Sequence, residues 1–405
     1  MMTKGTQNKT RRSPGDSEGA VRVALVVPHI FINRELLPRV IFSPGQLALD
    51  LAAGLGDFGV DVTFFTPGSA DTKIKNVTAD MSYFDKELEG RGYGYMELLK
   101  KHPATFVALA RQVQAELISK AYQMANDEHF DIVHIYANEE DIAMQFANLC
   151  EKPVMFNLHD PFNFLIKYKS VMPKYRHLNW ISISQSQRAG MPEDTNWVAN
   201  IYHGLDPANF DANFDATDDY FAYVGRIIEP KGVHLAIEAV RIYNRRHPDK
   251  KMKLKIAGKH YSDSSKDQYW EKYVKPELDE TIEYVGFIQG KPLNDFLKNA
   301  RALIVPSTFS EPFGMVTLEA FASGTPVVGL SVGATAEIVE DGKTGFIIRE
   351  TEEDPRILAI ADALEKIETI DGRDCRATVE ENFTLEKMIQ NYAELYQEMA
   401  KHTRR

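Results

Sequence analysis

Short apolar runs alternate with longer segments of helical periodicity along most of this chain. The first run, residues 21–28, reads VRVALVVP and is rich in β-branched residues, as a buried strand is. Residues 44–58 then carry leucines at helical spacing, and residues 60–65 form a second strand-like run. Strands that alternate with helices build a parallel sheet covered on both faces, so this pattern restricts the chain to the α/β class.

The alternation occurs in two sets, separated by a turn-rich stretch at residues 202–217. We therefore predict two α/β domains with a boundary near residue 206, an N-terminal domain of residues 21–205 and a C-terminal domain of residues 206–384. An amphipathic helix follows at about residues 385–400. The predicted strands are residues 21–28, 60–65, 132–136, 154–158 and 180–184 in the first set, and 220–224, 253–257, 282–285, 302–305 and 326–329 in the second. The predicted helices are residues 44–58 and 104–124 in the first set, and 233–244, 293–299, 316–322 and 357–367 in the second.

Two stretches do not follow the alternation. Residues 69–103 have weak periodicity and a cluster of Gly and Tyr, so we expect a long loop that is functional or mobile. Residues 1–20 are polar, contain four basic residues and lack an apolar core. They predict a disordered tail rather than a signal peptide.

The composition excludes several classes of protein. The chain has 47 basic and 58 acidic residues and a net charge of -11, which argues against nucleic acid as a partner. Two cysteines, Cys150 and Cys375, cannot form a disulfide framework, so we expect a protein of the reducing cytoplasm. No uncharged apolar run approaches the roughly 18 residues of a membrane helix. The 11 histidines lack ligand-type spacing and no Asp-x-Asp pair is present, so we expect neither a bound metal nor another cofactor.

The most informative stretch is residues 310–324, SEPFGMVTLEAFASG, which joins a turn to a helix. Gly314 allows the main chain to approach a ligand closely, and the free N–H groups of Gly314, Met315 and Val316 would favour an anion. Glu311 precedes the helix and Glu319 lies in its second turn, so the two carboxylates can flank one pocket. The alternative is a solvated helix carboxylate and an ordinary turn residue.

A second cluster, residues 224–232, reads VGRIIEPKG and joins a strand to a helix. Lys231 would lie at a helix N-terminus, where the dipole disfavours a cation by ~0.3–1 kcal/mol. A lysine is favourable there if an anion lies between it and the amides, and Arg226 adds a fork suited to phosphate oxygens. The alternative is two solvated surface cations.

In the first domain, His159 follows the strand-like run 154–158. Side chains at the carboxyl ends of strands line the ligand crevice of open α/β sheets. The same crevice would receive the turn at Gly45 that opens a helix. A histidine in this place can also be purely structural, with Asp160 as its hydrogen-bond partner.

Four stretches of the chain resemble glycosyltransferase family 4. Residues 310–329 and 333–348, SEPFGMVTLEAFASGTPVVG and GATAEIVEDGKTGFII, resemble its carboxyl-terminal signature, including two Glu with seven residues between them. Residues 224–240, VGRIIEPKGVHLAIEAV, resemble its diphosphate-binding strand-loop-helix, and residues 201–206, IYHGLD, its interdomain junction. The resemblance covers most of residues 20–400 and is more specific in the second domain.

The resemblance implies a GT-B fold, in which two Rossmann-like domains face each other across a cleft. It also implies that the terminal helix, residues 385–405, crosses back to the first domain. The implied activity is the retaining transfer of a hexosyl group from a nucleoside diphosphate sugar, by default UDP-glucose, to a hydroxyl acceptor. The family needs no catalytic metal.

The resemblance also implies roles for the candidate residues. Arg226 and Lys231 would hold the diphosphate, Glu311 would contact the sugar hydroxyls, Glu319 the ribose hydroxyls, and His159 would lie beside the sugar. Further donor contacts are implied for Gly45, Gly286, Phe287, Ile288, Phe313, Gly314, Met315 and Val316, and Gly333 and Glu337 lie in the loop that follows. The family often has a Gly-Gly pair where this chain has Gly45 alone, so the first-domain amide that meets the phosphate stays open.

Other functions remain compatible with the residues. Glu311 and Glu319 could act as the acid and base of a hydrolase, or the chain could bind a nucleotide sugar without turning it over. A transferase at a membrane surface with a lipid-linked acceptor is a further alternative, since Lys100, Lys101, Arg111 and Lys120 form a faint basic patch that could equally be a solvated helix face. Residues 30–42, with Arg34 and Glu35, could shape the acceptor site. The sequence does not predict the acceptor or the oligomeric state.

Overall fold

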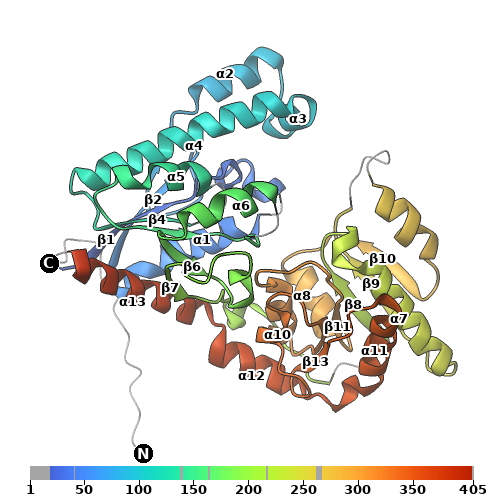
Figure 1. Ribbon diagram of the computed structural model, residues 1–405. Helices are drawn as coiled ribbons and strands as arrows, with labels where there is room; N and C mark the ends of the chain where they lie inside the picture. The colour runs from blue at the N-terminus through green and yellow to red at the C-terminus, as the bar shows by residue number, and fades with distance from the viewer. Residues whose placement is uncertain are drawn as a thin grey trace, which may run out of the picture.

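The computed structural model describes residues 19–40, 42–136, 140–162, 165–215, 218–260 and 267–403. The predicted tail lies outside the described residues, apart from Gly19 and Ala20. Within these ranges the chain forms two parallel β-sheets, each covered by helices, as Figure 1 shows. The α/β class and the two sets of alternating elements are thus confirmed.

The first sheet has the strand order β3-β2-β1-β4-β5-β6-β7, and all its pairs are parallel. Strand β1, which pairs with β2 and β4 inside the sheet, is buried along almost its whole length, because helices cover both faces of the sheet. The strands are β1 Val21–Val26, β2 Val60–Thr66, β3 Lys75–Thr78, β4 Ile132–Ile135, β5 Val154–Asn157, β6 Asn179–Ser182 and β7 Trp197–Asn200. The α-helices are α1 Ser43–Gly54, α2 Ser82–Arg91, α3 Tyr95–Lys101, α4 Pro103–Asn126, α5 Glu140–Phe146 and α6 Ile166–Val171. The short 3-10 helices are η1 Ile30–Ile32, η2 Leu37–Arg39, η3 Leu55–Phe58, η4 Ala147–Leu149, η5 Met172–Tyr175 and η6 Ser186–Arg188.

The second sheet has the order β10-β9-β8-β11-β12-β13 and is also parallel. The predicted boundary near residue 206 falls between β7 and β8 and stays a prediction. The strands are β8 Tyr220–Val224, β9 Lys253–Ala257, β10 Ile282–Gly286, β11 Leu303–Val305, β12 Val327–Leu330 and β13 Gly345–Ile348. The α-helices are α7 Val233–Arg246, α8 Lys291–Lys298, α9 Met315–Ala322, α10 Thr335–Ile338, α11 Glu353–Lys366 and α12 Gly372–Asn382. The remaining short elements are η7 Pro207–Asn209, η8 Glu229–Lys231, the π-helical turn η9 Trp270–Val274, η10 Lys275–Glu277 and η11 Ile367–Thr369.

The expectation of a long loop at residues 69–103 is wrong. The segment forms strand β3 and the two helices α2 and α3, which pack along one half of α4 in Figure 1. The Phe84 and Phe106 rings meet edge to face with their centroids 5.4 Å apart. Few apolar side chains are buried in α2 and α3, mainly Phe84, Leu88 and Leu98. This sparse apolar pattern explains why no periodicity was visible in the sequence.

The last helix, α13 Leu385–Thr403, packs on α1 and on the strands of the first sheet, so the implied crossing is confirmed (Figure 1). A buried polar network fixes it there. The Tyr396 hydroxyl lies 2.7 Å from Nδ1 of His134, and the Tyr392 hydroxyl donates to Oδ1 of Asn157 at 3.1 Å. Burial lowers the pKa of His134 to about 3, so the ring is neutral. Its Nε2–H donates to Oδ1 of Asn157 at 2.8 Å, and its Nδ1 accepts the proton of the Tyr396 hydroxyl.

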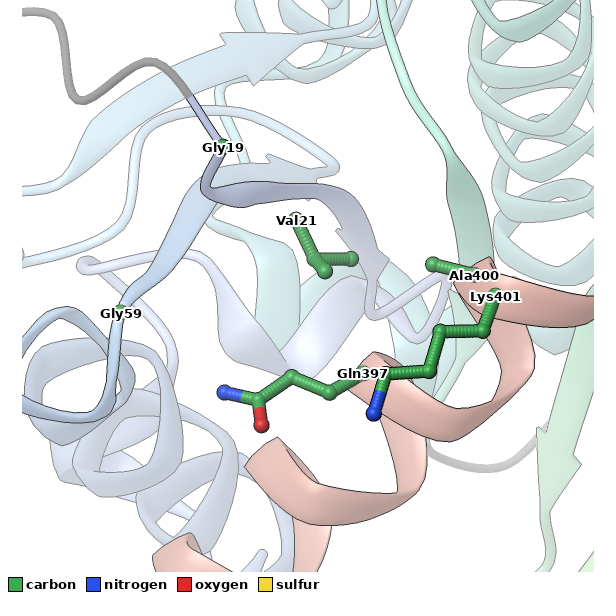
Figure 2. A pocket seen from close by; sticks show the side chains of 6 residues that line it. All are labelled: Gly19, Val21, Gly59, Gln397, Ala400 and Lys401. Atoms are coloured by element: carbon green, nitrogen blue, oxygen red, sulfur yellow. The ribbon is translucent and has the colours of Figure 1, made fainter. Parts of the chain in front are cut away.

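A shallow hollow lies where α13 meets the start of the first sheet. Figure 2 shows Gln397, Ala400 and Lys401 of α13 facing Val21 at the start of β1, with Gly19 and Gly59 at its edge. None of the predicted site residues lines this hollow. The predicted site residues therefore lie elsewhere in the structure.

Candidate functional site

The loop between β8 and α7 carries Arg226 and Lys231 at the carboxyl edge of the second sheet. Gly232 follows η8 with φ +68°, and a Cβ at this position would lie 2.1 Å from the carbonyl oxygen of Pro306, so only glycine fits. The Arg226 carbonyl accepts a hydrogen bond from the Tyr223 hydroxyl at 2.9 Å, and its side chain is exposed. The main chain is thus fixed while a guanidinium remains open to a ligand.

Lys231 and Glu311 form an ion pair that joins two loops 80 positions apart in the sequence. Nζ of Lys231 donates to Oε1 of Glu311, and the two side chains are only 17% and 16% exposed. Because both charges are largely withdrawn from water, loss of either partner leaves the other poorly compensated. The structure thereby brings together two residues for which the sequence implied separate roles.

The main chain at Glu311 is held by the loop after β12. Gly333 has φ +64°, and a Cβ on it would lie 2.3 Å from the Glu311 carbonyl oxygen. The next residue, Ala334, donates its N–H to that oxygen at 2.9 Å. Glu311 is therefore positioned both through its carboxylate and through its backbone.

The start of α9 presents unpaired backbone amides. Gly314 precedes the helix with φ +99°, and no side chain caps it. In the described part of the chain the N–H groups of Met315 and Val316 have no acceptor, as is usual for a first helical turn. The Phe313 side chain is buried, and that of Met315 packs against the cores of both domains. At these positions the backbone rather than the side chain is available to an anion.

Glu319 lies in the second turn of α9 with a half-buried carboxyl group. Among the described residues it has no side-chain partner, and burial raises its pKa to about 7. A half-buried carboxyl group without a protein partner among the described residues can accept hydrogen bonds from a ligand. This environment differs from that of a solvated helix carboxylate.

His159 follows β5 and is held by backbone and rings of the first domain. Its Nε2–H donates to the Tyr136 carbonyl at 2.7 Å, which leaves Nδ1 as an acceptor. Burial lowers the pKa of His159 to about 4, so the ring is neutral at physiological pH. Asp160, which the sequence offered as its partner, is not the group that binds Nε2.

An aromatic column joins His159 to the second domain. The ring of His203, in the segment between β7 and β8, stacks on that of His159 with a centroid distance of 5.0 Å and an interplanar angle of 7°. Its other neighbour is Phe313, whose ring meets it edge-on at 5.0 Å. His203 was missed in the sequence, although it lies in the junction IYHGLD at residues 201–206. Through it the histidine of one sheet lies close to the start of α9 on the other.

The carboxyl ends of β9 and β10 lie beside the Arg226 loop. A Cβ on Gly258 would lie 1.8 Å from the Gly225 carbonyl oxygen, and the Gly258 N–H donates to the Gly286 carbonyl at 2.8 Å. The Phe287 side chain is 42% exposed, with Nζ of Lys259 4.1 Å above its ring centre. Ile288 is half-buried. Gly286, Phe287 and Ile288 thus border the same edge of the sheet as Arg226.

Gly45 has a different environment from the one that its implied role suggests. It is buried, its N–H donates to the Phe42 carbonyl at 3.0 Å, and a Cβ would lie 2.7 Å from the Phe42 ring. Packing against Phe42 is sufficient to explain a glycine here.

Three of the four basic residues near α4 bind other groups of the protein, and Lys100 is exposed. Lys101 pairs with Glu97 at 2.5 Å, Arg111 pairs with Asp141 at 2.8 Å, and Lys120 donates to the Thr78 carbonyl. Among the helices described here, none has the length and apolar character needed to cross a bilayer. The described residues also contain no group of three His, Cys, Asp or Glu side chains arranged to hold a metal ion.

Comparison with known proteins connects this site to a family. Residues 206–382 match the family described as glycosyl transferases group 1. An uncharacterised glycosyltransferase of Methanocaldococcus jannaschii is 26% identical over 78% of this chain and 83% of its own length. The D-inositol 3-phosphate glycosyltransferase of Pseudarthrobacter chlorophenolicus is 30% identical over 36% of this chain, which corresponds to only 32% of that relative.

Solved structures share the arrangement of the whole chain. Sucrose-phosphate synthase from Thermosynechococcus elongatus superimposes with a TM-score of 0.69 at 17% identity, over 94% of this chain and 100% of that one. HepE of Anabaena, solved in complex with UDP and glucose, superimposes with a TM-score of 0.64 at 16% identity, over 92% and 98% of the two chains. These similarities establish a common two-domain fold.

Proposed function

Because this chain is a glycosyltransferase of the GT-B type, we propose that it transfers a hexosyl group from a nucleoside diphosphate sugar to a hydroxyl acceptor with retention of configuration. UDP-glucose is the proposed donor, and HepE, which shares the fold, was solved with UDP and glucose. The observation that carries the proposal is the Lys231–Glu311 pair beside the uncapped start of α9. A cation, a carboxylate and free amides together match a sugar attached to a diphosphate.

The departing diphosphate would be neutralised by the second domain. Arg226, Lys231 and the first amides of α9 lie where charge develops as the bond from the anomeric carbon to phosphate breaks. Lys231 would share its hydrogen bonds between Glu311 and a phosphate oxygen. No protein-bound metal is part of the proposal.

The transfer itself would use the face that the phosphate leaves. The acceptor oxygen forms a bond to the anomeric carbon, the bond to the β-phosphate oxygen breaks, and the acceptor proton passes to a phosphate oxygen. Glu311 would orient sugar hydroxyls rather than form a covalent intermediate, and Glu319 would accept hydrogen bonds from the ribose. The neutral His159 would face the sugar from the first domain.

The alternative of a transferase directed to a lipid surface has less support. Lys101 and Arg111 of the faint basic patch are already paired with acidic side chains. A hydrolase that uses Glu311 and Glu319 also has less support, because Glu311 is bound by Lys231. A cytoplasmic location remains part of the proposal, and the free Cys150 and Cys375 support it.

A donor and product assay tests the proposal. Thermal shift with a panel of nucleoside diphosphate sugars should show the largest stabilisation for UDP-glucose, since a bound donor stabilises the folded state. Proton NMR of the product formed from UDP-glucose and a panel of saccharide acceptors should show the anomeric configuration of the donor. A product of inverted configuration would contradict the retaining mechanism, and stabilisation by a GDP-sugar alone would contradict the choice of donor.

A further inference from the structure

The carboxylate of Glu337, on α10 of the second domain, binds backbone amides of the first domain. Oε2 accepts the Gln185 N–H at 2.8 Å and Oε1 accepts the Ser186 N–H at 2.6 Å. Oε2 also accepts a hydrogen bond from the Tyr202 hydroxyl at 2.9 Å. One side chain thus makes three hydrogen bonds to groups that lie 135 to 152 positions earlier in the sequence.

The residue after this pair of amides holds the main chain around His159. The buried Gln187 side chain donates from Nε2 to the Leu158 carbonyl at 2.6 Å and to the Asp160 carbonyl at 3.2 Å. Its Oε1 accepts the Ile183 N–H at 2.9 Å, so the amide group is fully occupied. The two carbonyls are the ones immediately before and after His159.

On the other side, Glu337 belongs to the loop that fixes Glu311. Gly333 packs against the Glu311 backbone, and Ala334 donates its N–H to the Glu311 carbonyl at 2.9 Å. Ala334 also accepts the Glu337 N–H at 2.9 Å, so the carboxylate and the Glu311 contact belong to one turn. A continuous path of hydrogen bonds therefore runs from Glu311 through this turn to the backbone at His159.

We propose that Glu337 and Gln187 are positioning residues that set His159 on the first domain relative to Glu311 on the second. This inference rests on the proposed function, since it concerns the geometry at which donor sugar and acceptor meet. Neither residue is assigned a contact with the substrates. Their effect is on turnover, because a misplacement of about 1 Å between reacting groups can lower a rate by about 100-fold.

The main test compares turnover with donor binding, with UDP-glucose as donor and UDP as binding probe. Glu337→Gln keeps the shape of the side chain but removes its charge and one of its acceptors. Gln187→Met keeps the volume but removes both hydrogen bonds to the carbonyls. We expect each to lower kcat for UDP release by ~10- to 100-fold. The KM for UDP-glucose and the Kd of UDP by calorimetry should change less than about twofold, because the proposed contacts to the diphosphate and the ribose belong to the second domain.

A double variant tests whether the two residues act along one path. If they do, Glu337→Gln combined with Gln187→Met loses no more in kcat than the worse single variant. The matched control is Glu340→Gln, since Glu340 lies in the same loop but its carboxylate pairs only with the exposed Lys343 at 2.8 Å among the described residues. This control should retain the kcat of the wild-type protein.

Hydrogen exchange gives a readout that does not need turnover. Glu337→Gln should speed amide exchange at residues 185–187 and also at residues 158–161, whereas Glu340→Gln should leave both segments unchanged. Absence of a response at 158–161, losses in kcat that multiply in the double variant, or equal losses in kcat and UDP affinity would each overturn the proposal. If the wild-type protein neither binds UDP nor cleaves UDP-glucose, the proposed donor is wrong. The hydrogen-exchange result alone then tests whether Glu337 is coupled to the backbone around His159.

Discussion

The two halves of the site are fixed by different kinds of contact. In the second domain, glycines bring backbone against backbone, as Gly232 does with Pro306 and Gly333 with Glu311. In the first domain, His159 is held by the stacked ring of His203 and by the side chain of Gln187 around it. Rigid backbone loops would suit the proposed diphosphate, whose chemistry is constant, whereas side-chain contacts between distant segments would adjust the proposed acceptor side.

The largest effect on this comparison is expected at Lys231. Lys231→Ala should lower turnover of UDP-glucose by ~10²–10³-fold, because a positive group aimed at the leaving diphosphate is lost. The assay is UDP release under saturating donor. The control is Lys250→Ala, an exposed lysine that pairs with Glu368 at 3.4 Å. Turnover close to that of the wild-type protein would contradict the proposal that this half of the site binds the diphosphate.

The contrast between the halves also determines what could be predicted from sequence. Arg226, Lys231, Glu311 and Glu319 lie in two continuous stretches, and local patterns were enough to select them as candidates. The contacts of Lys231 with Glu311 and of Glu337 with the first domain join residues 80 or more positions apart. Such pairs leave no periodic pattern in the sequence. The roles of His203 and Gln187 in the first-domain half therefore could not be predicted from it.

The same distinction holds for the fold. The predicted strands 220–224 and 253–257 agree with β8 and β9, because β8 is an almost fully buried apolar run and β9 alternates lysines with buried apolar residues. Strands β3, β7 and β13 were missed. Strands β3 and β7 are only partly buried, and β13 is a short run that begins with Gly345. Helices α2 and α3 were missed because each has only a narrow apolar face and therefore little helical periodicity. Packing against α4 stabilises them instead.

A glycine comparison tests the difference in rigidity. Gly232→Ala should destabilise the protein by ~3 kcal/mol, because a Cβ would meet the fixed Pro306 carbonyl and φ is positive. Gly45→Ala meets only side chains, mainly the Phe42 ring, which can move, and should cost ~1 kcal/mol. Urea unfolding measures both, and Gly56→Ala, with no atom within 4 Å of its Cβ, is the neutral control. Equal losses in the free energy of unfolding for Gly232→Ala and Gly45→Ala would contradict the difference in rigidity between the two halves.

A further difference between the halves is expected in the pH dependence of stability. Burial raises the pKa of Glu319 from its ordinary value of 4.5 to about 7, so the folded state holds this proton more tightly than the unfolded chain does. The resulting stabilisation is complete below pH 4.5 and is lost as the pH rises through 7. His159 behaves in the opposite way. Its pKa falls from 6.5 to about 4, and its contribution is present above 6.5 and lost as the pH falls through 4.

Glu319→Gln should therefore change only the alkaline side of the stability curve. At pH 8 the variant should be more stable than the wild-type protein by ~2 kcal/mol, a value reduced from the full shift because the carboxyl group retains some contact with water. At pH 4.5 the two proteins should be nearly equal, and the loss of stability between pH 6.5 and 4 that His159 causes should persist in both. Urea unfolding at a series of pH values gives these curves. Parallel curves between pH 5 and 8 would mean that the Glu319 carboxyl group is already solvated, and the second-domain half would then lack the buried acceptor proposed for the ribose.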